Sequence, residues 1–303
     1  MPRGIVSVVQ TPFDAQGRID PESLQRLVDD AIDAGVAGFL APAVASEVAA
    51  LSMNERESLL HLLTAQIRGR VPLIVGASSD DPQRCQDLGQ LAEEIDASGW
   101  LVSVPEHGYR RPETVAHFFH QVAADRRLPL IVQDLQFGGP GLPVEEIDRL
   151  RREIPLIQGV KIETVPAGPK YTAIRDRCGS AFYIAGGWAV PQMIEALDRG
   201  VDAMIPESSM VRVYQSIYRR HQSGDRANAL RLFRELLPIL SFANQELVTS
   251  IAFFKLLLVR KGIFVTDQLR LPGFAWDAHN RRIAEELIEH YLQLEQQCGD
   301  GVC

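Results

Sequence analysis

Residues 128–178, "LPLIVQDLQFGGPGLPVEEIDRLRREIPLIQGVKIETVPAGPKYTAIRDRC", contain a pattern that recurs along most of this chain. An apolar run at 128–135 precedes an amphipathic stretch at 143–154, and a second run at 156–163 precedes another at 169–178. Short runs rich in Val, Ile and Leu are typical of buried strands, whereas apolar residues three to four positions apart are typical of helices. The stretch therefore predicts two successive strand–helix units.

Six more units of the same kind extend the pattern from residue 4 to about residue 220. Their predicted strands are 4–10, 37–43, 71–78, 100–105, 182–187 and 202–206. Alternating strands and helices indicate a parallel sheet, and eight units in a little more than 200 residues are the count and size of a closed (β/α)8 TIM barrel of the α/β class. The alternative is an open doubly wound sheet, which usually carries a glycine-rich phosphate loop after its first strand. "VVQTPFDAQG" (8–17) is not such a loop.

After residue 224 the pattern contains helices only, at 226–262 and 277–297. We therefore predict a catalytic barrel domain over 1–223 and a C-terminal helical region over 224–303 that packs on it. The segment joining them has no linker-like or low-complexity composition.

Composition and charge favour a small-molecule partner. The 303 residues carry a formal net charge of -8, which argues against binding to nucleic acid or to an anionic membrane. No apolar run approaches the roughly 18 residues that span a bilayer. The N-terminus lacks a signal-peptide pattern, so a cytoplasmic location is expected. The four cysteines are expected to be free thiols, because they lack CxxC spacing, and neither they nor the histidines indicate a metal site.

Lys161 is an unusual residue for the apolar strand predicted at 156–163. Side chains alternate along a strand, so Lys161 and Glu163 are expected on the same side. If that side is the barrel interior, the lysine lies near the C-terminal end, where barrel enzymes keep their active sites. Desolvation there would favour the neutral amine, which can form an imine with a 2-oxo acid. Glu163 would then transfer a proton beside the imine, or the two residues form only a structural pair.

The chain resembles the dihydrodipicolinate synthase and N-acetylneuraminate lyase superfamily over nearly its whole length. The motifs that carry the resemblance are "TPFDAQGRID" (11–20), "SEVAALSMNER" (46–56), "GRVPLIVGAS" (69–78), "GVKIE" (159–163) and "GDRANALRLFRELLPIL" (224–240). The resemblance implies a class I aldolase-type (β/α)8 barrel with a C-terminal helical region, in which Lys161 forms the Schiff base. It also implies a homo-oligomer, a tetramer or dimer. No metal or organic cofactor is expected, because the protonated imine is itself the electrophile.

Two motifs of that superfamily are altered. Where its members carry GTTGE, residues 43–47 read "AVASE", so both carboxylate-binding threonines are absent. The amides of Val44 and Ala45 and the hydroxyl of Ser46 can still bind an anion. Where its members carry YNxPxR, residues 133–138 read "QDLQFG". Gln133 thus replaces the catalytic tyrosine, and a glycine replaces the arginine that recognises a second substrate.

Three further segments supply candidate site residues near strand ends. "VPEHGYRRP" (104–112) contains His107 and Tyr109 as candidate acids or bases, unless it is only a solvated loop. In "GGW" (186–188), Gly187 would let the backbone approach a ligand and Trp188 would form a wall. In "PESS" (206–209), Glu207 and Ser208 would bind sugar hydroxyls.

The combination of Ser46-Glu47, "VQD" (132–134) and "KIET" (161–164) is similar to the branch that contains 2-keto-3-deoxyarabonate dehydratase. That resemblance implies dehydration of a 2-oxo-3-deoxy sugar acid through the imine. One alternative is retro-aldol cleavage that releases pyruvate or another 2-oxo acid. Another is a catalytically impaired homologue that only binds a 2-oxo acid.

Overall fold

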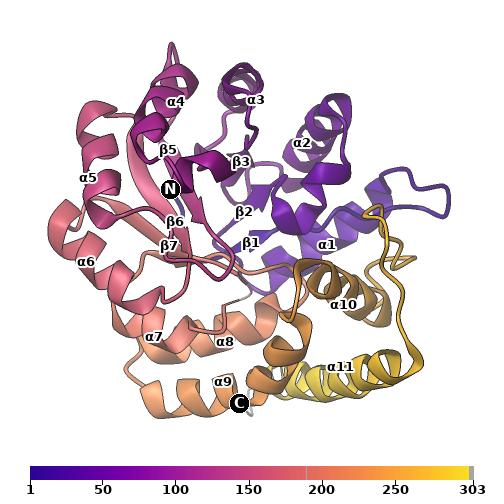
Figure 1. The fold of residues 1–303 in the computed structure, drawn as a ribbon. Helices are drawn as coiled ribbons and strands as arrows, with labels where there is room; N and C mark the ends of the chain where they lie inside the picture. Colours follow the sequence, from indigo (N-terminus) through magenta and orange to yellow (C-terminus); the bar gives the residue numbers. More distant parts are fainter. Residues whose placement is uncertain (189, 300–303) are drawn as a thin grey trace. The chain divides into compact units, whose positions relative to one another are not determined.

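The computed structural model describes residues 1–188 and 190–299. Cys303, one of the four cysteines expected to be free thiols, lies outside them. Eight parallel strands form a closed barrel in the order β1 to β8 (Figure 1). The strands are β1 (Gly4–Val8), β2 (Gly38–Ala41), β3 (Leu73–Gly76), β4 (Gly99–Ser103), β5 (Leu130–Leu135), β6 (Ile157–Glu163), β7 (Tyr183–Gly186) and β8 (Ala203–Met204). The predicted (β/α)8 architecture is confirmed.

Helices alternate with the strands and continue beyond them. The helices are α1 (Pro21–Asp33), α2 (Met53–Ile67), α3 (Pro82–Glu94), α4 (Glu113–Ala123), α5 (Val144–Glu153), α6 (Gly168–Cys178), α7 (Met193–Asp198), α8 (Val211–Gln222), α9 (Arg226–Ala243), α10 (Leu247–Arg260) and α11 (Ala278–Gly299). Three short 3-10 helices are η1 (Val44–Ser46), η2 (Val48–Ala50) and η3 (Glu106–Tyr109). The predicted helical stretch 226–262 therefore consists of two helices, α9 and α10. The C-terminal helical extension is confirmed.

Local sequence sets where several helices begin. The Asp20 side chain accepts hydrogen bonds from the backbone N–H groups of Glu22 and Ser23 at the start of α1. At α2, Ser52 and Glu55 form a capping box, in which each side chain accepts from the other residue's backbone N–H. These contacts satisfy N–H groups that have no partner within the first helical turn.

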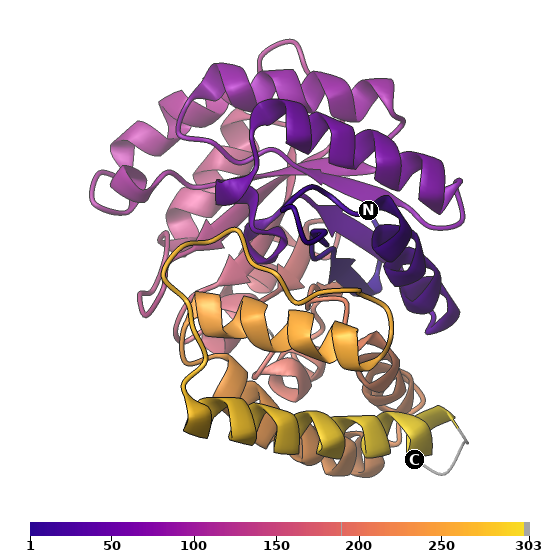
Figure 2. The same ribbon diagram turned by 90° about the vertical axis from the view of Figure 1, so that its right-hand side faces the viewer.

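The chain forms two compact units. One contains residues 1–6 and 72–205, including β3 to β8, and the other contains residues 7–71 and those from 206 onward. In the second unit, α11 contacts α8, α9 and α10 (Figure 2). The domain boundary expected at residue 223 stays a prediction. Among residues 1–188 and 190–299, no helix is both long and apolar enough to cross a membrane.

A fully buried ion pair lies within the second unit. Lys255 on α10 and Glu47 after η1 are both inaccessible to solvent and are hydrogen bonded to each other. The ammonium of Lys255 also donates to the carbonyl of Gln268 at 2.9 Å and lies 4.2 Å from the ring centre of Phe13. Burial lowers the pKa of Lys255 to about 8, although the Glu47 carboxylate opposes this effect. The cost of desolvating the lysine therefore exceeds its attraction to the carboxylate.

Candidate active site

The strands β5 and β6 bring three of the candidate residues close together. In the sheet register, Lys161 on β6 lies beside Gln133 on β5 and Ala185 on β7. Glu163 follows Lys161 by two residues, so both side chains project from the same face of β6. The fold therefore brings together the lysine, the carboxylate and the glutamine that the sequence singles out.

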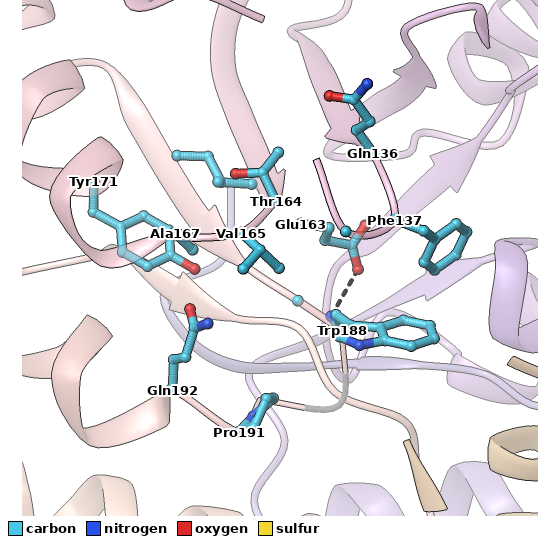
Figure 3. Close-up of a pocket in the computed structure, with 13 residues that line it drawn as sticks. Gln136, Phe137, Glu163, Thr164, Val165, Ala167, Tyr171, Trp188, Pro191 and Gln192 are labelled. Atoms are coloured by element: carbon cyan, nitrogen blue, oxygen red, sulfur yellow. Dashed lines mark hydrogen bonds between the residues drawn. The ribbon is translucent and has the colours of Figure 1, made fainter. Parts of the chain in front are cut away.

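The carboxylate of Glu163 is the centre of the resulting hydrogen-bond network. Its Oε1 accepts from Lys161 Nζ at 2.8 Å. The same oxygen accepts from the backbone N–H of Trp188 at 2.8 Å, the dashed line in Figure 3. Its Oε2 accepts from Gln133 Nε2 at 2.5 Å. The side chains of Lys161 and Glu163 are only 4% and 6% exposed. The lysine nitrogen is thus shielded from bulk water, and an amide and a backbone group fix the orientation of its carboxylate partner.

Gly187 allows the segment after β7 to approach this pair closely. A side-chain Cβ at this position would lie 2.3 Å from Glu163 Oε1 and 2.6 Å from Lys161 Cε. At these distances the ends of the Glu163 and Lys161 side chains would have to move, so glycine lets both keep their hydrogen-bonded positions. The following residue, Trp188, has a φ of 53° and directs its N–H to Glu163. Glycine therefore preserves the contact that holds the carboxylate.

A pocket of about 50 Å³ adjoins Glu163 within the first unit (Figure 3). It is lined by Gln136, Phe137, Gly138, Ile162, Glu163, Thr164, Val165, Ala167, Tyr171, Gly187, Trp188, Pro191 and Gln192. The rings of Phe137 and Trp188 meet edge to face, with centroids 4.8 Å apart. Glu163 is the one charged residue in this lining. The pocket walls can therefore contact apolar and hydroxyl groups but supply no cation for a second carboxylate.

Two other candidates are not brought to Lys161. His107 lies exposed in η3, and no contact joins it to the lysine among the described residues. Tyr109 lies near Asp134, which follows Gln133 on β5 and therefore points to the opposite face of the strand. Burial and the Asp134 charge raise the pKa of Tyr109. The acid–base roles expected for His107 and Tyr109 stay predictions.

The candidates near β2 lie in the second unit. Val44, Ala45 and Ser46 form η1. The hydroxyl of Ser46 donates to the carbonyl of Val9 at 2.5 Å and accepts from the backbone N–H of Ala43 at 2.9 Å. Since these two bonds engage its proton and one lone pair, Ser46 could contact an anion as a donor only by exchanging a partner. The anion-binding role of this segment stays a prediction.

The candidates after β8 also lie in the second unit and are buried. Ser208 is inaccessible to solvent, and its hydroxyl donates to the carbonyl of Val8 at 2.7 Å. Glu207 is 4% exposed, and its Oε2 accepts from Gln10 Nε2 at 3.2 Å and from the backbone N–H of Ser209 at 2.5 Å. Burial raises the pKa of Glu207, because desolvation disfavours its charged form. Sugar binding by these residues stays a prediction.

Sequence reasoning missed several residues that form the surroundings of the Lys161–Glu163 pair. Phe137, Tyr171 and Gln192 line the pocket, but pocket lining leaves no spacing signal in the sequence. The buried Lys170–Asp134 ion pair was missed as well. The signal available for that pair was "VQD", in which a charged residue ends an apolar run. Within residues 1–188 and 190–299, no group of three or more His, Cys, Asp or Glu side chains could hold a metal ion.

A family model and two known relatives each match most of this chain. The model of the dihydrodipicolinate synthetase family matches residues 1–291. A 4-hydroxy-tetrahydrodipicolinate synthase from Nitratidesulfovibrio vulgaris (strain DP4) is 30% identical over 240 residues, which cover 78% of this chain and 81% of the relative. An L-2-keto-3-deoxyarabonate dehydratase from Azospirillum brasilense is 29% identical over 276 residues, which cover 89% of this chain and 88% of the relative.

Solved structures share the fold. The structure of the 4-hydroxy-tetrahydrodipicolinate synthase from Methylacidiphilum fumariolicum SolV aligns with a TM-score of 0.87 and 21% identity. The alignment covers 98% of each chain, so the likeness includes both the barrel and the C-terminal helices.

Proposed function

The chain belongs to the dihydrodipicolinate synthetase family, whose members are lyases, and from this premise we propose that it dehydrates a 2-oxo-3-deoxy sugar acid through a Schiff base on Lys161. The observation that carries the proposal is the buried Glu163 carboxylate, 2.8 Å from the lysine nitrogen and 2.5 Å from the amide of Gln133. By the resemblance described above, Gln133 stands where the superfamily has its tyrosine. The Azospirillum brasilense dehydratase supports the same reaction class. The homo-oligomeric state and cytoplasmic location expected from the sequence stay predictions.

The proposed reaction begins with attack of the Lys161 amine on C2 of the substrate. Loss of water gives a protonated imine, which acidifies the C3–H bond. Glu163 lies beside the lysine and takes the C3 proton, leaving an enamine. The enamine expels the C4 hydroxyl, which leaves as water after receiving a proton from Glu163. Hydrolysis of the remaining imine frees Lys161 and releases a 2-oxo acid that contains one water less than the substrate.

The pocket composition supports a substrate whose distal end is uncharged. A dehydration uses one substrate, so the site needs no cation for the carboxylate of a second one. The segment 136–138 and the other walls of the pocket provide no lysine or arginine, whereas the amides of Gln136 and Gln192 and the hydroxyl of Tyr171 can bind sugar hydroxyls. These features favour a polyhydroxy chain beyond C4.

One experiment tests the proposal directly. The protein is incubated with 2-oxo-3-deoxy acids of five and six carbons, reduced with borohydride, weighed by mass spectrometry, and assayed for products. An adduct together with a dehydrated oxo acid supports the proposal. An adduct with release of pyruvate and an aldehyde assigns retro-aldol cleavage instead, and an adduct without turnover assigns the impaired homologue. Both of the latter results contradict dehydration.

Glu163→Gln should separate imine formation from proton transfer. Glutamine keeps the size of the side chain but cannot take the C3 proton, so kcat is expected to fall by about 10² to 10⁴-fold. Trapping of a pyruvate adduct should persist, because Lys161 is unchanged. Rates of trapping and of product formation, measured side by side, check this.

Glu145→Gln is the matched control, because this side chain is 72% exposed on α5. It should behave as the wild type in both assays. Wild-type kcat in Glu163→Gln would exclude the carboxylate as the base.

A further inference from the structure

Another buried ion pair lies directly behind the Lys161 site, on the opposite face of β5. Asp134 is inaccessible to solvent and Lys170 is 8% exposed. Lys170 Nζ donates to Asp134 Oδ2 at 2.5 Å and to the carbonyl of Pro140 at 2.7 Å. The pair therefore joins β5 and α6 to the loop 136–142 that follows β5.

The carboxylate of Asp134 also holds the far end of this loop. Its Oδ1 accepts from the backbone N–H of Leu142 at 3.0 Å. Gly141 has a φ of 71°, and a Cβ there would lie 2.4 Å from the same oxygen, so the loop is fitted closely around the carboxylate. The carbonyl of Gly139 accepts from the backbone N–H of Val165 at 2.8 Å, which fixes the loop to the segment after β6.

Phe137 connects loop 136–142 to the Lys161–Glu163 pair through Trp188. Phe137 is 56% exposed, and its ring packs edge to face on the ring of Trp188. The backbone N–H of Trp188 donates to Glu163 Oε1. On the other side of the network, Gln133 is the neighbour of Asp134 in the chain and donates to Glu163 Oε2. Asp134 is thus connected to both groups that orient the carboxylate.

We propose that Asp134 is a positioning residue, whose pair with Lys170 clamps loop 136–142 so that Phe137 and Trp188 hold Glu163 in the orientation for proton transfer. The effect on turnover rests on the proposed function, whereas the clamping of the loop does not. The clamp also explains why a charged pair is buried beside a site that it does not touch.

The test compares Asp134→Asn with the wild type by three measurements. Loss of the charge should release the loop, and kcat should fall by about 10 to 100-fold, because small misplacements of a catalytic group have effects of this size. KM should change less than about threefold and adduct trapping with pyruvate should persist, since Lys161 is not displaced. The near-UV circular dichroism contributed by Trp188, isolated by subtraction of Trp188→Phe spectra, should be lost.

Asp148→Asn is the matched control within the same unit. Asp148 is also a buried aspartate, 5% exposed, with arginine partners on α5 and α6, but it does not touch loop 136–142. It should lower stability without changing kcat or the Trp188 signal. If it changes both as Asp134→Asn does, a general loss of packing explains the data and the proposal is overturned.

The clamp can still be tested if Asp134→Asn does not fold or if the wild type shows no turnover. If Asp134→Asn does not fold, Gly141→Ala replaces it, because the added methyl displaces the loop without removing the charge. If the wild type turns over no 2-oxo-3-deoxy acid, the proposed function fails, and the Trp188 signal still decides on the clamp. If a folded Asp134→Asn variant keeps the near-UV circular dichroism contributed by Trp188, the clamp proposal is overturned.

Discussion

Lys161→Arg is expected to abolish the borohydride-trapped adduct with pyruvate and to lower turnover by on the order of 10³-fold or more. Arginine retains the positive charge beside Glu163, but its guanidinium stays protonated and does not form an imine. The substitution thus removes the covalent step while keeping the ion pair that Lys161 makes at 2.8 Å. Mass spectrometry of the reduced protein and a product assay measure the two effects.

The position of the adduct can be assigned because the chain contains four lysines, at 161, 170, 255 and 261. Peptide mapping should locate the adduct at Lys161 alone. Lys261→Arg serves as the control, since Lys261 is paired with Asp30 and Glu295 in the second unit. An adduct that survives in Lys161→Arg would show that the imine forms on another lysine, and the proposed site would be wrong.

The barrel could be predicted because its signal is local. Each strand is a short apolar run and each helix an amphipathic stretch with apolar residues three to four positions apart, so the order of elements follows from the local sequence. The alternation of side chains along a strand places Lys161 and Glu163 on one face of β6. Their proximity therefore needed no information from distant parts of the chain.

The contacts around this pair could not be predicted in the same way, because they join segments far apart in sequence. The N–H that Trp188 donates to Glu163 follows Gly187, where a side chain would displace the ends of Glu163 and Lys161. Tyr109 fits the expectation of an acid–base residue by type, yet it lies near Asp134, which points away from the Gln133 face. Residue type predicts which chemistry the Tyr109 side chain can perform. Its place relative to Lys161 depends instead on the face of β5 from which its neighbour Asp134 projects.

Lys255 shows that the partner of a buried charge could not be predicted from the local sequence either. In "IAFFKLLLV" (251–259) it interrupts an apolar run, and the pattern favours a contact on one face of an amphipathic helix. The structure instead buries it completely, because Glu47, more than two hundred residues earlier in the chain, provides its counter-charge. No property of the helix sequence indicates this partner.

Lys255→Met is expected to destabilise the protein by about 3–5 kcal/mol, because it leaves the Glu47 carboxylate buried without its cation. The backbone N–H groups of Arg270 and Leu271 still donate to Glu47 Oε2, at 2.8 and 3.1 Å, but they do not neutralise its charge. Urea unfolding of the variant and the wild type at neutral pH measures the free-energy difference.

The double variant Glu47→Gln/Lys255→Met decides whether the loss comes from the unpaired charge or from the missing lysine contacts. Desolvation lowers the pKa of Lys255 to about 8, so the charged pair contributes little net stability, and the neutral pair of similar volume should recover most of the lost free energy. Recovery to within about 1 kcal/mol of the wild type would identify charge burial as the cause. A double variant as unstable as Lys255→Met would instead attribute the loss to the contacts of Lys255 with Phe13 and the Gln268 carbonyl, and the electrostatic explanation would be wrong.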